Sequence, residues 1–342
     1  MKRILVTGDK GYIGSVLVPL LIKNNYEAIG LDTEYFTDVL GKEERIKYES
    51  IKKDIREIEG SDVENIDTII HLCSLSNDPL GEINPRLTAE INYKSAIRLA
   101  EIAKDTGVKK FIFSSSCSIY GGAAKKFATE DDKLEPLTPY ALSKVKTEQE
   151  LIQMTSKTFL PIILRNATVY GYSPKMRLDL VVNNLVASAI TTGKITLLSN
   201  GKAWRPLIHI KDLAYIFLAM VREEFNNESP KIFNVGTEEQ NYQIIYIAKK
   251  IKKQLPECEI QIKKKYFADK RNYKVSFKKL TTEFPDITLT TSLEEGIREL
   301  ITVFNKFRFS EKDFNDRKYS RLKEIQYLLK KEKIDNNLFW KN

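Results

Sequence analysis

The chain has 342 residues, and its content of 42% hydrophobic and 30% charged residues is typical of a globular protein large enough for two lobes. The formal net charge is +9, but the lysines stand in short runs interleaved with apolar residues, which favours solvated faces over a nucleic-acid-binding surface. Three cysteines and two histidines without metal-ligand spacing exclude a zinc site, and no apolar stretch reaches membrane length, so we expect a cytoplasmic protein.

Apolar runs alternate with amphipathic segments through the first half of the chain. This alternation predicts parallel strands joined by right-handed crossovers, and therefore a Rossmann-type, doubly wound α/β sheet. The runs that predict strands are Arg3–Thr7, Glu27–Leu31, Thr68–Leu72, Phe111–Ser114 and Pro161–Leu164. The segments that predict helices are Tyr12–Asn24, Pro85–Thr106 and Tyr140–Thr155.

The order of predicted elements is less regular after Leu164. Helices are expected over Asp179–Thr192, Tyr242–Gln254, Leu293–Asn305 and Tyr319–Lys331, and a strand over Ile232–Val235. We therefore expect a Rossmann domain over residues 1–170, to which segments around 205–240 return, an interleaved smaller lobe over 171–305, and a helical tail over 306–342. The apolar residues Leu338, Phe339 and Trp340 indicate that this tail is docked.

A glycine-rich loop follows the first predicted strand and opens the first predicted helix. Its sequence is Thr7-Gly8-Asp9-Lys10-Gly11-Tyr12-Ile13-Gly14, with glycines at i, i+3 and i+6. Gly8 permits a tight turn, Gly11 lets the backbone approach a pyrophosphate, and Gly14 lets the helix lie close to the strand. The helix amino end then faces the diphosphate. The loop therefore predicts a dinucleotide site.

Two acidic residues refine this prediction. Asp32 ends the second strand, where a carboxylate accepts hydrogen bonds from the adenosine ribose and repels a 2′-phosphate, so NAD is favoured over NADP. Asp54, followed by Ile55, is placed to face the adenine. An aspartate that only caps the next helix would have the same pattern, and that alternative stays open for Asp54.

A serine, a tyrosine and a lysine form a reactive set. The strand ending Ser114-Ser115-Ser116 delivers hydroxyls to the carboxyl edge of the sheet. Tyr140 and Lys144 are four residues apart and share one face of a helix, which can place an ammonium beside a phenol. A phenol is a poor base at neutral pH until a nearby cation stabilises the phenolate. With Ser116 holding a substrate oxygen, Tyr140 could then accept its proton as hydride leaves the carbon.

The chain resembles the extended short-chain dehydrogenase/reductase family, specifically its nucleotide-sugar epimerase and dehydratase group. The resemblance covers nearly all of residues 1–305. It rests on the glycine loop, Asp54-Ile55-Arg56, His71-Leu72, Ser114-Ser115-Ser116-Cys117-Ser118-Ile119-Tyr120-Gly121, Tyr140-x-x-x-Lys144, Arg205-Pro206-Leu207-Ile208-His209 and Phe233-Asn234-Val235-Gly236.

The resemblance implies tightly held NAD, a nucleoside-diphosphate sugar in the carboxyl-terminal lobe, and a homodimer formed through the helices at Pro85–Thr106 and Tyr140–Thr155. It gives the catalytic roles to Ser116, Tyr140 and Lys144. Implied cofactor contacts are Gly8, Gly11, Tyr12, Ile13, Gly14, Asp32, Asp54, Ile55, Leu72, Asn92, Ser114, Tyr140 and Lys144. Implied substrate contacts are Ser116, Asn166, Arg177, Arg205 and Arg271, where guanidinium groups suit a diphosphate.

Two departures from the family pattern narrow the expected reaction. Relatives that remove water across C5 and C6 carry Asp-Glu directly after the catalytic hydroxyl, whereas this chain has Cys117 and Ser118, which cannot readily replace an acid and base pair. Thr168 stands where many relatives have asparagine. We therefore expect a nucleotide-sugar C4 epimerase. The alternatives are a C4 dehydrogenase or ketoreductase, which needs the same three residues, and a non-catalytic NAD-binding sensor or scaffold.

Overall fold

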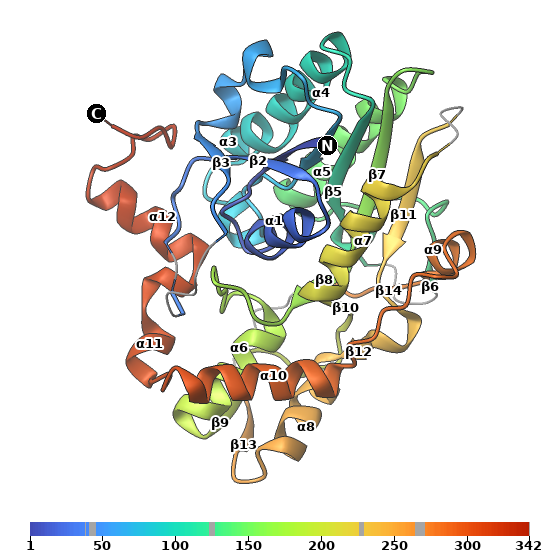
Figure 1. Ribbon diagram of the computed structural model, residues 1–342. Helices are drawn as coiled ribbons and strands as arrows, with labels where there is room; N and C mark the ends of the chain where they lie inside the picture. The colour runs from blue at the N-terminus through green and yellow to red at the C-terminus, as the bar shows by residue number, and fades with distance from the viewer. Residues whose placement is uncertain (38, 41–45, 123–126, 226–228, 264–270, 342) are drawn as a thin grey trace.

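The computed structural model describes residues 1–342 except 38, 41–45, 123–126, 226–228, 264–270 and 342. Its centre is a seven-stranded sheet in the order β11-β7-β5-β4-β1-β2-β3 (Figure 1), and every neighbouring pair is parallel. The strand order reverses between β1 and β4, as in a doubly wound Rossmann sheet. The strands are β1 (Arg3–Thr7), β2 (Glu27–Asp32), β3 (Glu49–Lys52), β4 (Thr68–His71), β5 (Lys110–Ser116), β7 (Leu160–Asn166) and β11 (Lys231–Val235).

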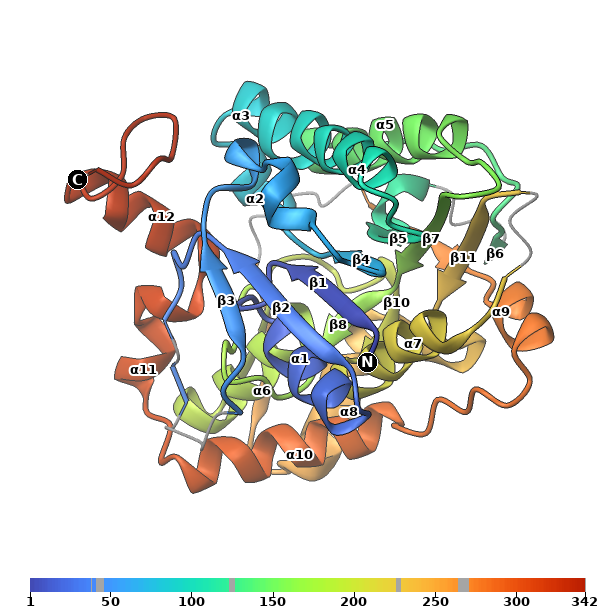
Figure 2. The same ribbon diagram turned by 45° about the horizontal axis from the view of Figure 1, so that its top comes forward.

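Helices cover both faces of the sheet (Figure 2), and each face has its own apolar core. Successive residues of β5 alternate between the cores, because side chains alternate along a strand: Ile112 joins the core under α1 and α7, and Phe111 joins the core under α4 and α5. These helices are α1 (Gly14–Lys23), α4 (Ser95–Asp105), α5 (Pro139–Gln153) and α7 (Ile210–Arg222). Three further helices of the chain are short: α2 (Asp78–Gly81), α3 (Pro85–Ala89) and α9 (Lys278–Glu283).

Most predicted elements are confirmed, and two need correction. The helix predicted over Pro85–Thr106 is interrupted between α3 and α4 by a π-helical turn, Glu90–Lys94, which aims the side chain of Asn92 inward at Leu75. The helix predicted from Tyr242 begins at Ile244, because Asn241–Gln243 forms β12, which pairs antiparallel with β10 (Trp204–His209). The prediction did not include β3 and α7.

The smaller lobe lies beyond the carboxyl edge of the sheet. Its apolar core unites residues of α6, α8 and α10, with α10 crossing the bottom of the view in Figure 1. The sheet β12-β10-β8 and the strand pair β13-β9 complete the lobe, while β14 pairs with β6. The bounds are β6 (Phe127–Ala128), β8 (Thr168–Tyr170), α6 (Val181–Thr192), β9 (Lys194–Leu197), α8 (Ile244–Gln254), β13 (Glu259–Ile262), β14 (Lys274–Val275) and α10 (Leu293–Lys306).

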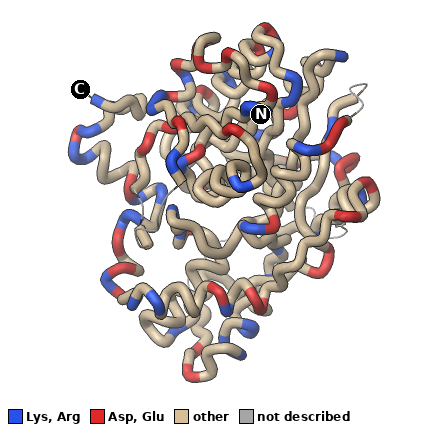
Figure 3. Tube along the Cα trace, viewed as in Figure 1, with Lys and Arg blue, Asp and Glu red and all other residues tan. Residues whose placement is uncertain are grey.

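The carboxyl-terminal tail runs back along the Rossmann domain, as Figures 1 and 2 both show. It contains α11 (Glu311–Asn315) and α12 (Arg321–Lys330), and α12 contacts α2. Ile325, Leu328 and Leu338 of the tail belong to the same apolar core as α4. Basic and acidic segments alternate along the visible trace (Figure 3). Among the described residues, no helix combines the length and apolarity that a membrane span requires.

Candidate functional site

The glycine loop connects β1 to α1 in a conformation that only glycine suits. Gly8 has a φ of +78°, and a Cβ there would lie 2.9 Å from the backbone nitrogen of Cys73. A Cβ on Gly14 would lie 2.3 Å from the carbonyl oxygen of Gly8, so any larger residue would push α1 away from β1. At Gly11 the corresponding distance to that oxygen is 3.0 Å. Because these positions have no Cβ, a ligand can approach the backbone of the loop closely.

The amino end of α1 fits the diphosphate of a dinucleotide. The N-cap residue Ile13 makes no side-chain hydrogen bond to the helix, and the first turn of α1 carries no acidic residue. Such an end presents backbone N–H groups and the positive pole of the helix to an anion. Next to Ile13, the Tyr12 hydroxyl donates to the carbonyl of Gly171 at 2.6 Å and so ties the loop to the smaller lobe.

Asp32 ends β2 at the same edge of the sheet. Burial raises the pKa of Asp32 to about 6, although the backbone N–H of Glu34 donates to its carboxylate at 2.7 Å. A carboxylate that has lost solvent and has few donors gains most from new hydrogen bonds. Ribose hydroxyls supply such bonds, so the geometry of Asp32 fits the adenosine half of NAD.

Asp54 caps the turn that follows β3 and forms an ion pair with Arg56. Its carboxylate accepts the backbone N–H of Arg56 at 2.9 Å, and the Nε and Nη2 groups of the same arginine at 2.8 and 2.7 Å. Asp54 thereby caps the 3₁₀ turn Ile55–Glu57, in which Ile55 is buried. The structure confirms the capping alternative for Asp54, and its contact with the adenine stays a prediction.

Leu72 and Asn92, two of the predicted cofactor contacts, are held by hydrogen bonds to neighbouring segments. Leu72 follows β4, and its N–H donates to the carbonyl of Thr7 at 3.0 Å. The buried Asn92 amide accepts the N–H of Leu75 at 2.7 Å and donates to Ser143 at 3.2 Å. Asn92 therefore links the segment after β4 to α5. Through these bonds it can fix the position of both segments, and its own contact with the cofactor stays a prediction.

Ser116, Tyr140 and Lys144 converge at the carboxyl end of β5. Ser116 is the last residue of β5, and its Oγ accepts the N–H of Ser118 at 3.1 Å. Tyr140 lies in the first turn of α5, which begins after the N-cap Thr138. The Ser116 hydroxyl donates to the Oγ of Ser118 at 3.0 Å and lies near enough to Tyr140 to lower the pKa of the phenol. Lys144 is 2% exposed, one turn further along α5.

The charge balance around Tyr140 opposes phenolate formation in the ligand-free protein. Burial, with a smaller contribution from the carboxylate of Asp78, raises the pKa of Tyr140 to about 12. The hydrogen bond with Ser116 and the guanidinium of Arg177 act in the opposite direction. Tyr140 therefore needs additional positive charge nearby before it can serve as a base near neutral pH.

Lys144 is held slightly away from the phenol. Its Nζ donates to the carbonyl of Ser114 at 2.8 Å and lies 5.7 Å from the centre of the Tyr140 ring. Burial lowers the pKa of Lys144 to about 8. The predicted neighbourhood of ammonium and phenol is present, but the first partner of the ammonium is the end of β5.

A buried ion pair fixes α5 against the sheet. Glu148, one turn after Lys144, binds Arg165 of β7 with an N–O distance of 2.8 Å, and the two side chains are 1% and 4% exposed. Glu148 also accepts a hydrogen bond from Ser115 of β5. These contacts set the position of the helix that carries Tyr140 and Lys144 relative to Ser116.

Arg205 and Arg271 lie together at the opening of the smaller lobe. The Nη1 of Arg205 donates to the carbonyl of Arg271 at 2.6 Å, and both guanidinium groups lower the pKa of Tyr273 against the larger effect of its burial. Arg271 also forms an ion pair with Asp78 of α2 on the Rossmann side. The structure therefore brings the two predicted diphosphate ligands together. Asp269 and Lys270 of the same sequence motif lie outside the described residues.

The remaining predicted substrate residues, Asn166 and Arg177, line the same region. Asn166 ends β7 and donates to the Oγ of Ser114 at 2.9 Å, while its Oδ1 is buried without a partner among the described residues. That acceptor is suited to a sugar hydroxyl. Arg177 is buried, forms an ion pair with Asp179 at 2.9 Å and donates to Ser76 at 2.9 Å.

Cys117 and Ser118 occupy the positions where a dehydratase would carry its acid and base. The Cys117 thiol is 1% exposed, donates to the carbonyl of Arg165 at 3.1 Å, and has a pKa raised by burial. Ser118 is also buried. The Ser118 hydroxyl accepts a hydrogen bond from Ser116 at 3.0 Å, and neither position carries a carboxyl group.

Sequence reasoning missed Asp78. Its carboxylate accepts the Thr138 hydroxyl at 2.5 Å, pairs with Arg271 and raises the pKa of Tyr140. Asp78 follows β4 in the sequence Asn77-Asp78-Pro79, a pattern typical of the start of a helix. Its position after the carboxyl end of β4 was the one sequence feature that could have indicated a place in the site.

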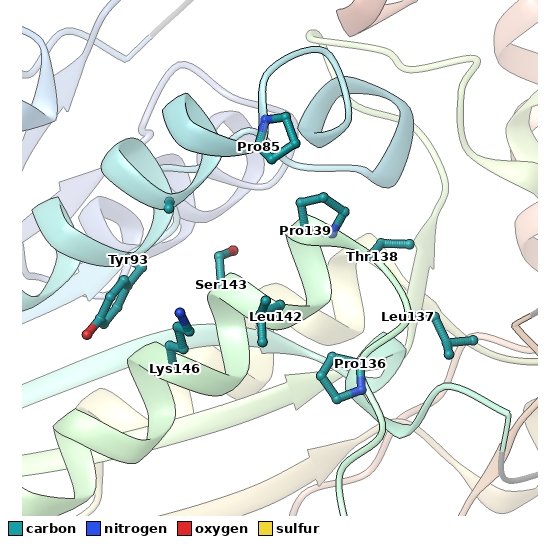
Figure 4. Close-up of a pocket in the computed structure, with 10 residues that line it drawn as sticks. Pro85, Tyr93, Pro136, Leu137, Thr138, Pro139, Leu142, Ser143 and Lys146 are labelled. Carbon is teal, nitrogen blue, oxygen red and sulfur yellow. The ribbon is translucent and has the colours of Figure 1, made fainter.

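A groove of about 340 Å³ lies on the outer side of α5 (Figure 4). Pro139, Leu142, Ser143 and Lys146 line it from α5, whereas Tyr140 and Lys144 are not among its lining residues. This groove is therefore separate from the catalytic residues. The groove lies between the two segments through which the homodimer is predicted to form. The homodimer stays a prediction, and light scattering of the chain and of a Leu142→Glu variant would test it.

Comparisons with known proteins agree with this geometry. Residues 4–236 match the model of the NAD dependent epimerase/dehydratase family. The chain is 23% identical over 89% of both chains to dTDP-D-glucose 4,6-dehydratase of Mus musculus, and 28% identical over 68% of this chain and 77% of the relative to UDP-glucose 4-epimerase of Bacillus subtilis. The solved NAD dependent NDP-hexosamine 5,6-dehydratase TunA superposes with a TM-score of 0.80 at 24% identity, covering 90% of this chain and 98% of that one.

Proposed function

The chain belongs to the NAD-dependent epimerase/dehydratase family, whose members are NAD-dependent enzymes that act on nucleotide sugars, and we propose that it interconverts the C4 epimers of a nucleoside-diphosphate hexose. The observation that carries this proposal is the convergence of Ser116, Tyr140 and Lys144 at the end of β5. Cys117 and Ser118 support it, because the family resemblance places them where dehydratases carry an acid and base pair. Oxidation at C4 needs only the first three residues. Loss of water needs the other two positions as well.

The glycine loop, the amino end of α1 and Asp32 would hold NAD, which accepts hydride from C4 and returns it. Tyr140 removes the proton of the C4 hydroxyl as the C4–H bond breaks, leaving a 4-keto sugar. Ser116 donates to the C4 oxygen and keeps it within reach of Tyr140. Once the ketosugar had turned over and been reduced on its other face, Tyr140 would return the proton to the C4 oxygen. The net reaction is isomerisation without consumption of NAD.

Lys144 contributes part of the positive charge that Tyr140 needs, and the nicotinamide ring of bound NAD would contribute the rest. Its ammonium lies 5.7 Å from the phenol ring and is positioned by the carbonyl of Ser114. In a site that excludes water, a fixed charge at this distance stabilises the phenolate more strongly than it would in solvent. Lys144 can therefore lower the barrier to proton removal while Tyr140 remains the group that touches the substrate.

Arg205 and Arg271 would bind the diphosphate of the sugar nucleotide. Planar guanidinium groups bind phosphate oxygens in pairs, and the two arginines are joined through the Arg271 carbonyl. In the ligand-free protein Arg271 pairs with Asp78, so a diphosphate would have to exchange for, or share, that carboxylate.

A panel of nucleoside-diphosphate hexoses deuterated at C4 tests the proposal. An epimerase converts a substrate to its C4 epimer with deuterium retained at C4, unchanged mass and no lasting absorbance at 340 nm. A C4 dehydrogenase or ketoreductase, which would use the same three residues, instead changes the substrate mass by two hydrogens and accumulates or consumes NADH. Either that result or loss of water from the sugar would overturn the C4 epimerase proposal.

A further inference from the structure

The last residues of the chain form a small, closed loop, residues 334–340, which we call the terminal loop. Ile334 and Trp340 form an antiparallel bridge across its base. Inside it, the Asp335 carboxylate accepts the N–H groups of Asn337 and Phe339 at 2.9 and 2.8 Å. These bonds give the loop a definite shape of its own.

The terminal loop contacts the chain where β2 ends. The Trp340 indole donates to the carbonyl of Thr33 at 2.6 Å, and its ring lies 5.6 Å from that of Tyr35. The Tyr35 hydroxyl in turn donates to the carbonyl of Leu338. Thr33 directly follows Asp32, the residue that fits the adenosine ribose.

The loop reaches the ends of the two neighbouring strands as well. Beyond β3, Arg56 donates to the carbonyl of Asn337 at 2.8 Å and stacks on the Phe339 ring at 3.7 Å. Beyond β4, Leu75 lies in the same apolar core as Leu338, and both line one groove. The ends of β2, β3 and β4 surround the adenosine half of a dinucleotide in a Rossmann sheet.

Arg56 links the terminal loop to the cofactor side of the sheet. One side of its guanidinium holds Asp54 through Nε and Nη2, and Nη1 holds Asn337. Its side chain is 12% exposed. Without the loop, Arg56 would lose the Phe339 ring and one hydrogen bond, and its guanidinium would be held by Asp54 alone.

We propose that the terminal loop is a further part of the cofactor site, forming the outer wall of the adenosine pocket and slowing the release of bound NAD. A wall contributed by the end of the chain can retain NAD without altering the glycine loop. The proposal concerns NAD retention alone, so it holds or fails independently of the sugar chemistry.

The test compares the full chain with a variant that ends at Lys333 and with the double variant Phe339→Ala and Trp340→Ala. NAD release is followed by exchange of bound NAD for labelled NAD, without any sugar. Release should be roughly tenfold faster in both variants. Tyr215→Ala, which removes an aromatic ring 58% exposed on α7, is the matched control and should release NAD at the original rate.

A measurement on the intact chain covers the case in which the truncated chain does not fold. Amide hydrogen exchange should show that residues 335–341 gain protection when NAD binds, because the wall closes on the adenosine. Equal release rates in the full chain and in a folded variant would overturn the proposal, as would unchanged protection of these amides in NAD-loaded protein.

Discussion

The catalytic residues and the arginines of the substrate side differ in what their side chains already bind. The Ser116 hydroxyl donates to Ser118, and the Lys144 ammonium donates to the Ser114 carbonyl of β5, so neither group is paired with a carboxylate. Arg177 and Arg271 are paired with Asp179 and Asp78. The first group is organised before substrate arrives. In the second group, a substrate diphosphate must compete with the carboxylates that already bind the arginines. Turnover rate and substrate affinity are therefore controlled by separate contacts.

The largest effect is expected from Tyr140→Phe, which removes the proton acceptor and keeps the ring. The turnover rate should fall by about 10²–10⁴-fold, the usual contribution of a positioned acid or base. Bound NAD and KM should change little, because the arginines are untouched. Steady-state kinetics checks this, with Tyr215→Phe as the matched surface variant. If turnover fell by less than about tenfold, the proton would have to pass to another group.

Lys144 should produce an alkaline limb in the pH profile of kcat/KM. Its pKa is lowered to about 8, so the ammonium is present below pH 8 and lost as the pH rises through that value. The activity that depends on its charge must therefore decline above pH 8. In Lys144→Arg the limb should move to higher pH, since arginine stays charged. A limb that stays in place in Lys144→Arg would assign it to a different group.

Asp78→Asn should affect both the catalytic residues and the arginines, and its effect on activity should be smaller than those of the substitutions at Tyr140 and Lys144. Removing the carboxylate removes a charge that raises the pKa of Tyr140, so the acidic limb of the turnover profile should shift to lower pH. Arg271 is freed for the diphosphate, and KM should fall by up to about fivefold, because a partly exposed ion pair contributes about 1 kcal/mol or less. Glu82→Gln on the exposed end of α2 is the control. A rise in KM would mean that Asp78 itself binds substrate.

The smallest effect is expected from Cys117→Ser. The serine hydroxyl can still donate to the Arg165 carbonyl, and the position does not reach the reacting groups. Stability should change by about 1 kcal/mol, turnover should stay within about twofold, and the product should be the same. Thermal unfolding and product analysis measure these. A large loss of turnover in a folded, NAD-loaded variant would place the thiol in the chemistry and break the contrast between the two regions.

Elements with strong local patterns could be predicted, and elements that depend on distant partners could not. β1, β2, β4, β5 and β7 are buried on both faces, so each appears as a continuous apolar run. β3 is the edge strand, and its residues are all partly or fully exposed, so no such run marks it. The π-helical turn at Glu90–Lys94 has no period that distinguishes it from the helices on either side.

The sequence by itself determined the Rossmann sheet, the glycine loop and the trio Ser116, Tyr140 and Lys144, because each depends on residue types at short, fixed spacings. Only the tertiary structure decided what the charged groups bind. Asp78 meets Arg271 from 193 residues away, and Trp340 meets Thr33 from 307 residues away. Sequence spacing contains no information on such pairs, since they form only after the sheet has set where its strands end.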